Sequence, residues 1–402
     1  MIPRLKPYYN YNEVLAALRF YNKNSVTKFE QNFANLFHSK HAQSFSYGRS
    51  ALYSLFKALN FENAEIILPA YTCVVVAHAI TISGNIPRFV DISLNDYNMD
   101  LDKTAKKINK NTKAIIATHL FGYPLNLDKL NEIVNAAEKK FGSKIWIIHD
   151  CAHSFGAKWK NQLVCNQGDA AIFGLNISKI ISSIFGGMVI SNNDELFFKL
   201  KNLIAVSYQK PANTKSLKRL LYLLAVRIAF NKTIYGFINF LEEETNVLNS
   251  FTDYYKEDIV DFPADFLDSM LEIESRVGIE QLKKYPEIIE MRKANADYYF
   301  QNLKGIKELI LPPEIDGATY SHFVPRIPNR SELLSKMRKK GIQPGWLIEY
   351  SIPEMAAYKK WKDEDFPNSF HCSKYTINLP NWPGMKKHDL EYITSKLNSY
   401  FS

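Results

Sequence analysis

The stretch that decides the fold contains three apolar runs, Ile145-Trp-Ile-Ile-His-Asp150, Gly168-Asp-Ala-Ala-Ile-Phe-Gly174 and Gly186-Gly-Met-Val-Ile-Ser191. Between the second and the third lies a polar turn, Leu175-Asn-Ile-Ser-Lys179. Short apolar runs bounded by glycine and polar residues are typical of buried β-strands. The pattern predicts that the first strand ends on the carboxylate of Asp150 and that the turn between the other two presents Lys179.

Asp150 and Lys179 together are the two groups that pyridoxal phosphate (PLP) chemistry requires of a protein. A lysine amine forms the Schiff base with the cofactor, and a carboxylate keeps its pyridinium nitrogen protonated. Each residue alone has an ordinary explanation, since most lysines are solvated surface charges and an aspartate after a strand often caps a helix or forms a turn. The pair at this spacing, with a glycine-rich strand behind it, favours a PLP site in which Lys179 is catalytic.

Strand-like and helix-like segments alternate along the chain on the N-terminal side of this stretch. Strands are expected at 42–47, 65–69, 88–91 and 113–119, and helices at 48–59, 74–82 and 127–141. Before them, Phe29, Phe33 and Phe37 recur at intervals of four residues, which predicts one face of a helix. The alternation predicts an α/β protein with a doubly wound, mainly parallel sheet.

The C-terminal part has a different order of elements. Two helices, 269–285 and 287–303, are expected after Pro263, and they are followed by strands at 321–327 and 375–379 and by helices at 330–340 and 387–400. This mixture predicts a small α+β domain. The expected division is a large domain over residues 1–285 and a small C-terminal domain over residues 286–402.

Three groups of polar residues follow expected strands, at the edge of the sheet where ligands of such folds bind. They are Gly48-Arg49-Ser50, Tyr71-Thr72-Cys73, and Asp150 with His153. Gly48 begins a helix, so neighbouring backbone N–H groups are predicted to hold a phosphate at the positive end of the helix dipole, with the Arg49 side chain as a further donor. An ordinary helix start, capped by Ser46 or Ser50, explains the same residues and stays open as an alternative.

The composition excludes several classes of protein. The 402 residues carry 50 basic and 41 acidic side chains, a net charge of +9, without a basic tail of the kind that nucleic-acid-binding proteins carry. Four scattered cysteines form no metal-binding pattern, so we expect no metal site and reduced thiols. The N-terminus lacks the apolar core of a signal peptide, and no run reaches the roughly 20 apolar residues that span a bilayer. The expected location is the cytoplasm.

A segment of unusual composition, about residues 205–250, is predicted to be an insertion in the large domain. No acidic residue lies between Glu195 and Glu242, whereas eight basic residues do. Within the segment, the run 220–230 is mostly apolar and follows a basic cluster. A helix packed in a subunit interface or over the active site is the favoured interpretation, because apolar residues surround much of the helix. Peripheral membrane contact through residues 215–230 is the alternative.

Taken together, these segments resemble the DegT/DnrJ/EryC1/StrS family of PLP-dependent sugar aminotransferases, which have the fold type I architecture. The similarity extends from about Phe29 to the C-terminus and rests on the order and spacing of several motifs. The motifs are Tyr47-Gly-Arg-Ser-Ala-Leu52, Leu68-Pro-Ala-Tyr-Thr72, Phe89-Val-Asp-Ile92, His119-Leu-Phe-Gly-Tyr-Pro124, Asp150-Cys-Ala-His-Ser-Phe-Gly-Ala157, Gly168-Asp169, Lys179, Gly186-Gly-Met-Val189, Val277-Gly-Ile-Glu-Gln-Leu282 and Leu379-Pro380.

The resemblance implies a role for each matching position. Lys179 is similar to the lysine that forms the Schiff base, and Asp150 to the carboxylate that faces the pyridine nitrogen. His153 matches a position that contacts the 3′-oxygen side of the cofactor. Cys73 matches a position that usually stacks an aromatic ring on the cofactor. The turn that binds the phosphate is matched by Gly48, Arg49 and Ser50.

The chain departs from the family pattern at several of these positions. Cys73 is a poor stacking platform, Gly174 replaces a serine that usually reaches the phosphate, and Arg49 replaces the usual threonine. An asparagine expected from the neighbouring subunit shortly before Met270 is not evident. Arg49 is therefore predicted to take over part of the phosphate binding, since an arginine–phosphate contact is stronger than a neutral hydroxyl bond.

The resemblance implies a homodimeric aminotransferase that moves an amino group from L-glutamate to a keto-sugar linked to a nucleotide, in amino-sugar or surface-glycan biosynthesis. Three alternatives stay open. Sugar dehydratases of the same family have histidine where this chain has Lys179, which disfavours that reaction. The altered pocket also fits another PLP-dependent reaction, or an acceptor linked to a lipid. The last alternative is a non-catalytic binding or regulatory protein that retains the fold.

Overall fold

The computed structural model describes residues 1–19, 24–231, 234–236 and 259–402. Among these residues, the central sheet has seven strands in the order β1-β9-β8-β5-β4-β2-β3. They are β1 (His41–Phe45), β2 (Glu65–Pro69), β3 (Ile86–Val90), β4 (Thr112–Thr118), β5 (Trp146–Asp150), β8 (Ala170–Gly174) and β9 (Gly187–Ser191). The pairs β2–β3, β2–β4, β4–β5 and β5–β8 are parallel, whereas β9 is antiparallel to both of its neighbours. The sheet is therefore mainly parallel, as the sequence predicts.

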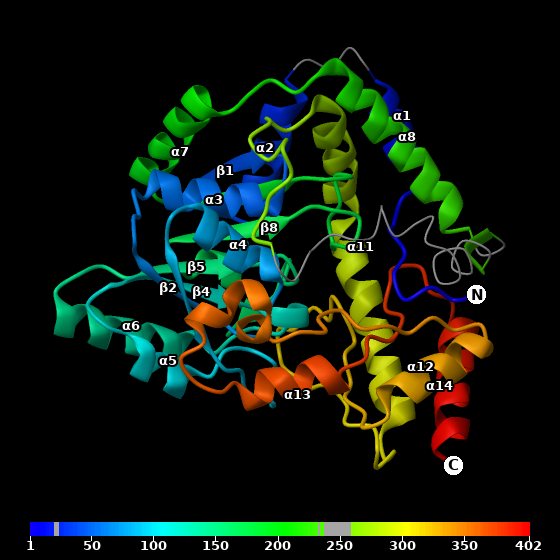
Figure 1. The fold of residues 1–402 in the computed structure, drawn as a ribbon. Coiled ribbons are helices and arrows are strands. Elements are labelled where there is room, and N and C mark those ends of the chain that lie inside the picture. The colour runs from blue at the N-terminus through cyan, green and yellow to red at the C-terminus, as the bar shows by residue number, and fades with distance from the viewer. Residues whose placement is uncertain (20–23, 232–233, 237–258) are drawn as a thin grey trace.

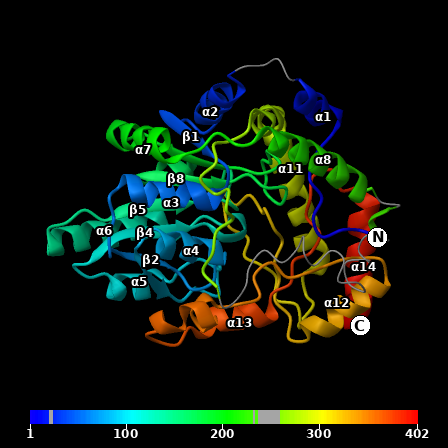
Figure 2. The same cartoon turned by 45° about the horizontal axis from the view of Figure 1, so that its top comes forward.

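Helices cover both faces of this sheet, as Figure 1 and Figure 2 show. Ile148 of β5 belongs to an apolar cluster shared with α3 (Gly48–Ala58), α4 (Val74–Ile82) and α7 (Asp194–Ser207). Ile147, one residue earlier, belongs to the opposite cluster, shared with α2 (Ser25–Leu36), α5 (Leu101–Lys107), α6 (Leu127–Phe141) and α11 (Glu272–Leu303). Successive side chains of a strand point to opposite faces, so burial on both faces explains the continuous apolar runs in the sequence.

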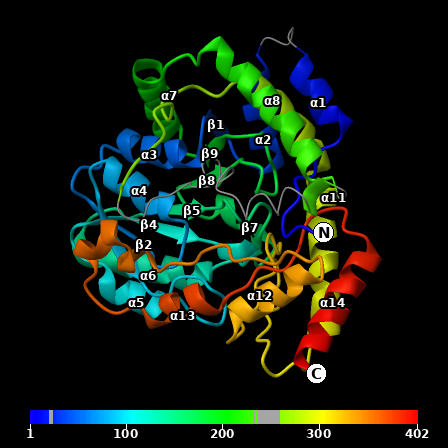
Figure 3. The same cartoon turned by 45° about the vertical axis from the view of Figure 1, so that its right-hand side comes forward.

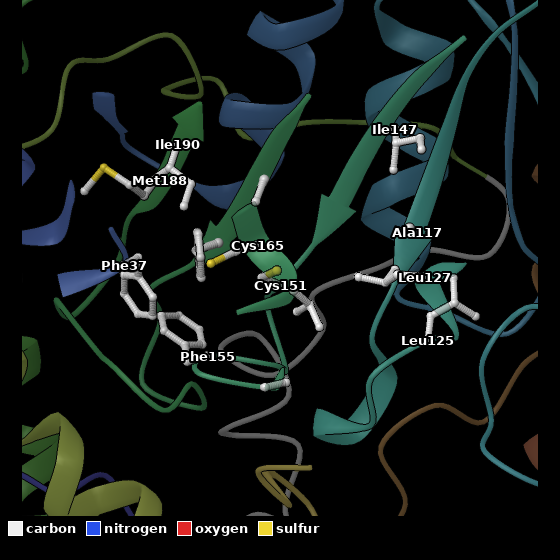
Figure 4. Close-up of a cluster of buried hydrophobic side chains, with 14 of the residues drawn as sticks. Phe37, Ala117, Leu125, Leu127, Ile147, Cys151, Phe155, Cys165, Met188 and Ile190 are labelled. Atoms are coloured by element: carbon white, nitrogen blue, oxygen red, sulfur yellow. The ribbon is translucent and has the colours of Figure 1, made fainter. Parts of the chain in front are cut away.

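The face that α2 covers is rich in aromatic rings. The ring centroids of Phe33 and Phe37 lie 4.7 Å apart, and those of Phe37 and Phe155 lie 6.2 Å apart. Figure 4 shows Phe37 next to Phe155, with Cys151 and Cys165 of the same cluster close by. The phenylalanines that recur at intervals of four residues in the sequence are fully buried, so the predicted helix face is confirmed. Ring pairs at these distances stabilise the core beyond the area that they bury.

The long helix α11 is a single element of 32 residues that contains Pro286. The sequence predicts two helices here, because proline lacks the N–H group that a helix interior uses. That prediction is wrong. Ile288 and Ile289, just after the proline, are buried in the same cluster as Leu282 before it, so packing on both sides carries the helix through Pro286. We still propose a boundary between the large and small domains at residues 285 and 286. This boundary lies inside α11.

The C-terminal part consists of helices and isolated strand pairs around its own core. Its helices are α12 (Arg330–Lys339), η3 (Ile352–Glu354), η4 (Ala356–Trp361), α13 (Pro367–Tyr375) and α14 (Lys387–Phe401). Two isolated antiparallel bridges, Phe323 with Leu379 and Arg326 with Thr376, pair the two predicted strands without a continuous ladder. The core of this part also includes Tyr71 and Phe121 from loops of the sheet, so the C-terminal part packs on the edge at which those loops lie.

Two further helices, α1 (Tyr11–Leu18) and α8 (Asn213–Ala229), contact each other and α11, as Figure 3 shows. The helix α8 lies in the described part of the predicted insertion, and most of residues 230–250 lie outside the described residues. In the part of the chain that the structure describes, no helix is long and apolar enough to span a bilayer. The remaining short elements are η1 (Leu120–Gly122), β6 (Lys158–Trp159), β7 (Gln162–Leu163) and η2 (Val164–Asn166).

Candidate active site

The topology brings the predicted site residues to one edge of the sheet. Since β1 and β8 are both antiparallel to β9, β1 runs in the same direction as β8 and the other parallel strands. Gly48 follows β1, Cys73 follows β2, Asp150 ends β5 and Lys179 follows β8. The carboxyl ends of these strands therefore meet at one edge, which is where ligands of open α/β sheets bind.

Lys179 lies half-buried in the turn between β8 and β9, close enough to Asp150 for each to act on the pKa of the other. Burial lowers the pKa of Lys179, whereas Cys73 and Asp150 oppose this shift. Burial raises the pKa of Asp150, whereas the N–H group of Ala152, 3.0 Å from Oδ1, and the Lys179 ammonium oppose that shift. Both shifts favour the neutral forms. A lysine amine in such surroundings is activated as a nucleophile and as a base.

His153 lies three residues after Asp150 and faces a second histidine. Its ring centroid is 4.9 Å from that of His322 and 6.1 Å from that of Phe121, whose ring is nearly parallel to it. Burial lowers the pKa of His153 well below its ordinary value, and Lys179 and His322 lower it further, so the ring is neutral at pH 7. The buried Nδ1 atom has no hydrogen-bond partner among the described residues. His322, from the C-terminal part, is thus a neighbour of the site that is not among the residues matched to the family.

Cys73 is the N-terminal cap residue of α4 and acts on the pKa of Lys179, which places its thiol near the amine. Tyr71, two residues earlier, is fully buried, and its hydroxyl oxygen lies 3.0 Å from Oγ1 of Thr376. The Tyr71 ring is therefore fixed in the C-terminal core. It does not replace the aromatic ring that the family usually has at the position of Cys73.

Glycines let the start of α3 approach β8 and β9. A Cβ atom on Gly187 would lie 2.3 Å from the carbonyl oxygen of Tyr47, which is too close for any side chain. A Cβ atom on Gly48 would lie 3.2 Å from Cα of Gly174, and one on Gly174 would lie 3.3 Å from Cε of Lys179. The start of α3 is thus packed directly against the strand that leads to Lys179. Gly174, where the family usually has serine, leaves room for the lysine side chain.

Arg49 and Ser50 share the first turn of α3 but lie in different surroundings. The guanidinium carbon of half-buried Arg49 lies 5.7 Å from the centroid of the Tyr47 ring and 5.9 Å from that of Phe262. Ser50 is fully buried, with its hydroxyl oxygen 3.4 Å from that of Ser46. Tyr47 occupies the cap position and forms no side-chain cap bond, so capping by either serine is not observed. The N–H groups of this turn therefore lack a side-chain cap, as a phosphate site requires.

A network that includes the inserted helix α8 holds the same turn, and the sequence does not reveal it. The Tyr47 hydroxyl donates to the carboxylate of Asp265, whose two oxygens lie at 2.9 and 3.0 Å. Arg219 of α8 donates to the same hydroxyl at 3.2 Å and to Oε1 of Glu274 at 2.8 Å. Lys215, one turn earlier on α8, pairs with Asp265 at 2.8 Å. The sequence signal, a basic segment, shows the cations but not their partners.

These groups fit PLP, which needs an amine, a countercharge for its ring nitrogen and a site for its phosphate. Lys179 and Asp150 offer the first two, and the uncapped start of α3 offers the third. The unpartnered Nδ1 atom of His153 is a buried polar atom that a bound ligand would satisfy. No group of three or more side chains suited to a metal ion occurs among the described residues.

A model of the DegT/DnrJ/EryC1/StrS aminotransferase family matches residues 8–234 and 248–398. The chain belongs to this family. As a DegT-family protein it has PLP as its cofactor and is an aminotransferase by enzyme class, so the predicted family, fold class, cofactor and enzyme class are confirmed. The seven predicted site residues remain a prediction, which the geometry above supports.

Similar proteins span nearly the whole chain. A GDP-perosamine synthase of Escherichia coli O157:H7 is 25% identical over 94% of this chain and 91% of its own length. A dTDP-3-amino-3,6-dideoxy-alpha-D-galactopyranose transaminase of Aneurinibacillus thermoaerophilus is 26% identical over 97% and 93%. A GDP-4-keto-6-deoxy-D-mannose 3-dehydratase of Escherichia coli O55:H7 is 26% identical over 87% and 84%. Among solved structures, Helicobacter pylori PseC, an aminotransferase involved in the biosynthesis of pseudoaminic acid, superposes with a TM-score of 0.78 at 20% identity over 100% of this chain and 99% of its own, and thus has the same fold.

Proposed function

We propose that this DegT-family enzyme transfers an amino group from L-glutamate to a keto-sugar linked to a nucleotide. The observation that carries the proposal is the pair of half-buried Lys179 and buried Asp150 at the carboxyl edge of the sheet. The transaminase relative supports the acceptor class, since its name specifies a dTDP-linked amino-sugar and this chain covers 93% of its length.

Each site residue has its own task in this reaction. When bound, PLP supplies an electron-withdrawing ring that stabilises negative charge on the substrate carbon. Lys179 would link to the cofactor at rest and, once released, carry the substrate proton on Nζ, and its lowered pKa keeps more of the amine able to accept that proton. Asp150 would face a positively charged ring nitrogen. Burial raises the pKa of Asp150, and that positive charge would lower it again. Neutral His153 would contact the 3′ oxygen through its free ring nitrogen.

Lys179 also separates this proposal from the dehydratase reaction of one relative. The resemblance gives histidine at this position in the dehydratases. An imidazole does not form a Schiff base, whereas a lysine amine does. A lysine here therefore favours amino transfer.

We also propose a homodimer, because the resemblance places the active sites of this family at a subunit interface. Light scattering of the purified protein would report about twice the chain mass of 46.4 kDa. A mass equal to one chain at the concentrations used for activity would remove this part of the proposal.

The decisive experiment is mass spectrometry of the PLP-loaded enzyme with glutamate labelled with ¹⁵N and a panel of nucleotide-linked keto-sugars. The proposal expects one member of the panel to gain the labelled amino group in the wild-type reaction and not in a Lys179→Ala reaction. Bound PLP without labelled product from any nucleotide sugar would favour another PLP-dependent reaction. Failure to bind PLP at all would favour a binding protein that retains the fold.

A further inference from the structure

Two neighbouring helices expose apolar side chains on their outer faces. On α8, Leu217, Leu221 and Ile228 keep 58%, 57% and 60% of their surface accessible. Their spacing of four and seven residues places them in one stripe along the helix. Large apolar side chains that gather on a surface mark a place where another molecule is bound.

The inner side of α8 determines which side stays exposed. Leu223 and Val226 of α8 are buried. Lys215 and Arg219 form ion pairs with carboxylates beneath the helix, and each keeps only 13% of its side chain exposed. The helix cannot turn its apolar stripe inward without breaking this packing and these pairs. Of the basic residues that precede the apolar run, two therefore hold α8 to the protein and are not available to an outside partner.

The helix α1 extends the apolar surface beside α8. The guanidinium carbon of Arg227 on α8 lies 4.0 Å from the centroid of the Tyr11 ring on α1, and Figure 3 shows the two helices side by side. On α1, Tyr11, Leu15 and Leu18 recur at helical spacing and keep 75%, 53% and 44% of their surface accessible. We define the α1/α8 patch as Tyr11, Leu15, Leu18, Leu217, Leu221 and Ile228.

Within the described helices α1 and α8, the exposed charges have one sign. Glu13 is the single acidic residue of the two helices, and it is buried and paired with Lys284. Lys218 on α8 and Arg19 at the end of α1 are exposed. The outer faces of these two helices thus combine apolar side chains with cations and carry no carboxylate. A surface of this composition complements an anionic bilayer, whose headgroups attract cations while the acyl boundary takes up apolar side chains.

We infer that the α1/α8 patch docks this enzyme on an anionic membrane surface. A second copy of the chain complements the patch less well, because a twofold contact would bring two identical cationic patches together, with no carboxylate on the outer faces of α1 and α8 to pair with Lys218 or Arg19. The patch would lie in the plane of the interface, as an amphipathic helix pair does. The inference concerns where the enzyme works, and it does not depend on the identity of the acceptor.

Vesicle sedimentation tests this inference on the full-length, PLP-loaded protein. The protein is mixed with vesicles of phosphatidylcholine alone and with vesicles that also contain phosphatidylglycerol. We expect sedimentation with the second kind, weakened by added salt because the cations are screened. The variant Leu217→Asp/Leu221→Asp should lower the vesicle partition coefficient by about tenfold or more, since two apolar contacts become charged.

The matched control is Phe370→Asp, because Phe370 is an apolar residue of 50% exposure on α13, which lies away from α8 in Figure 1. The control should sediment like the wild type, and thermal unfolding shows whether both variants are folded. Wild-type protein that stays in the supernatant with both kinds of vesicle overturns the inference. So does a Leu217→Asp/Leu221→Asp variant that turns a dimer into a monomer in light scattering, because the patch would then belong to a second copy.

Discussion

The two ends of the candidate site are built in different ways. At the end with the reactive groups, Lys179, Asp150 and His153 come from one continuous stretch of chain, and burial is the main cause of their pKa shifts. The phosphate end is the start of α3 at Gly48, Arg49 and Ser50. Hydrogen bonds and ion pairs around Tyr47, made by distant segments of the chain, hold it in place. Reactive groups need a dry environment, whereas an anion site needs donors in fixed positions. Substitutions at the end with the reactive groups should therefore affect turnover. Substitutions at the phosphate end should affect cofactor affinity and stability.

The strongest test of this distinction is Lys179→Ala. Loss of the amine removes both the covalent link to PLP and the proton carrier, so turnover should fall by roughly 10³-fold or more. The absorbance band of lysine-linked PLP should disappear, while the free energy of unfolding stays close to that of the wild type. Lys199→Ala, at an exposed lysine paired with Glu195, is the control and should leave all three quantities unchanged. Retained amino transfer in Lys179→Ala would refute the assignment.

Asp150→Asn should have the next largest effect. The change keeps the shape of the side chain and removes the negative charge, so kcat/KM should fall by about 10²- to 10³-fold. PLP affinity should fall much less, because the phosphate end is unchanged. Steady-state kinetics and a fluorescence titration with PLP measure the two quantities. Equal losses in both would show that the two ends are not separate in function.

The reactive end could be predicted from the sequence because each of its groups follows directly after a buried apolar run. Asp150 ends β5, and Lys179 follows β8 by five residues, so strand order alone brings them to one edge. The start of α3 could be predicted for the same reason, since Gly48 follows β1. Periodicity fixes such local positions well, because they depend on short stretches of chain.

The phosphate end could not be predicted in full, because its partners lie far apart in the chain. Arg219 and Tyr47 are separated by 172 residues, and Arg219 and Glu274 by 55. The sequence shows a basic segment but not the carboxylates that it meets. The same limit applies to Pro286, whose local preference for ending a helix is overridden by buried residues on both sides.

Arg219→Met tests whether the network around Tyr47 stabilises the fold. Burial raises the pKa of Glu274 from its ordinary value of 4.5 to about 7, even though Arg219 lowers it. Because this folded-state pKa lies above the unfolded value, the contribution of the carboxyl group to stability is full below about pH 4.5 and is lost as the pH rises through 7. Without Arg219, the ionised Glu274 at pH 8 would have lost its cation. The free energy of unfolding should fall by about 2 kcal/mol at pH 8 and by less at pH 5.5.

Urea unfolding at the two pH values measures this difference. Lys199→Met breaks an exposed pair with Glu195 and should leave the free energy of unfolding nearly unchanged at either pH. PLP should also bind Arg219→Met a few times more weakly, since Tyr47 loses one of its donors. A cost that is the same at pH 5.5 and pH 8 would mean that Glu274 keeps one protonation state over this range, contrary to the prediction.

Arg49→Thr sharpens the comparison at a single residue of the phosphate end and should have the smallest effect. The substitution installs the residue that the family usually has, and it replaces a charged donor by a hydroxyl group. If Arg49 offsets the absence of serine at Gly174, the Kd for PLP should rise by about tenfold, with kcat at saturating PLP nearly unchanged. Lys57→Thr, near the other end of α3, is the control for loss of one positive charge and should change the Kd by less than about twofold. An unchanged Kd in Arg49→Thr would leave the N–H groups of α3 as the phosphate site and assign Arg49 to packing against Tyr47 and Phe262.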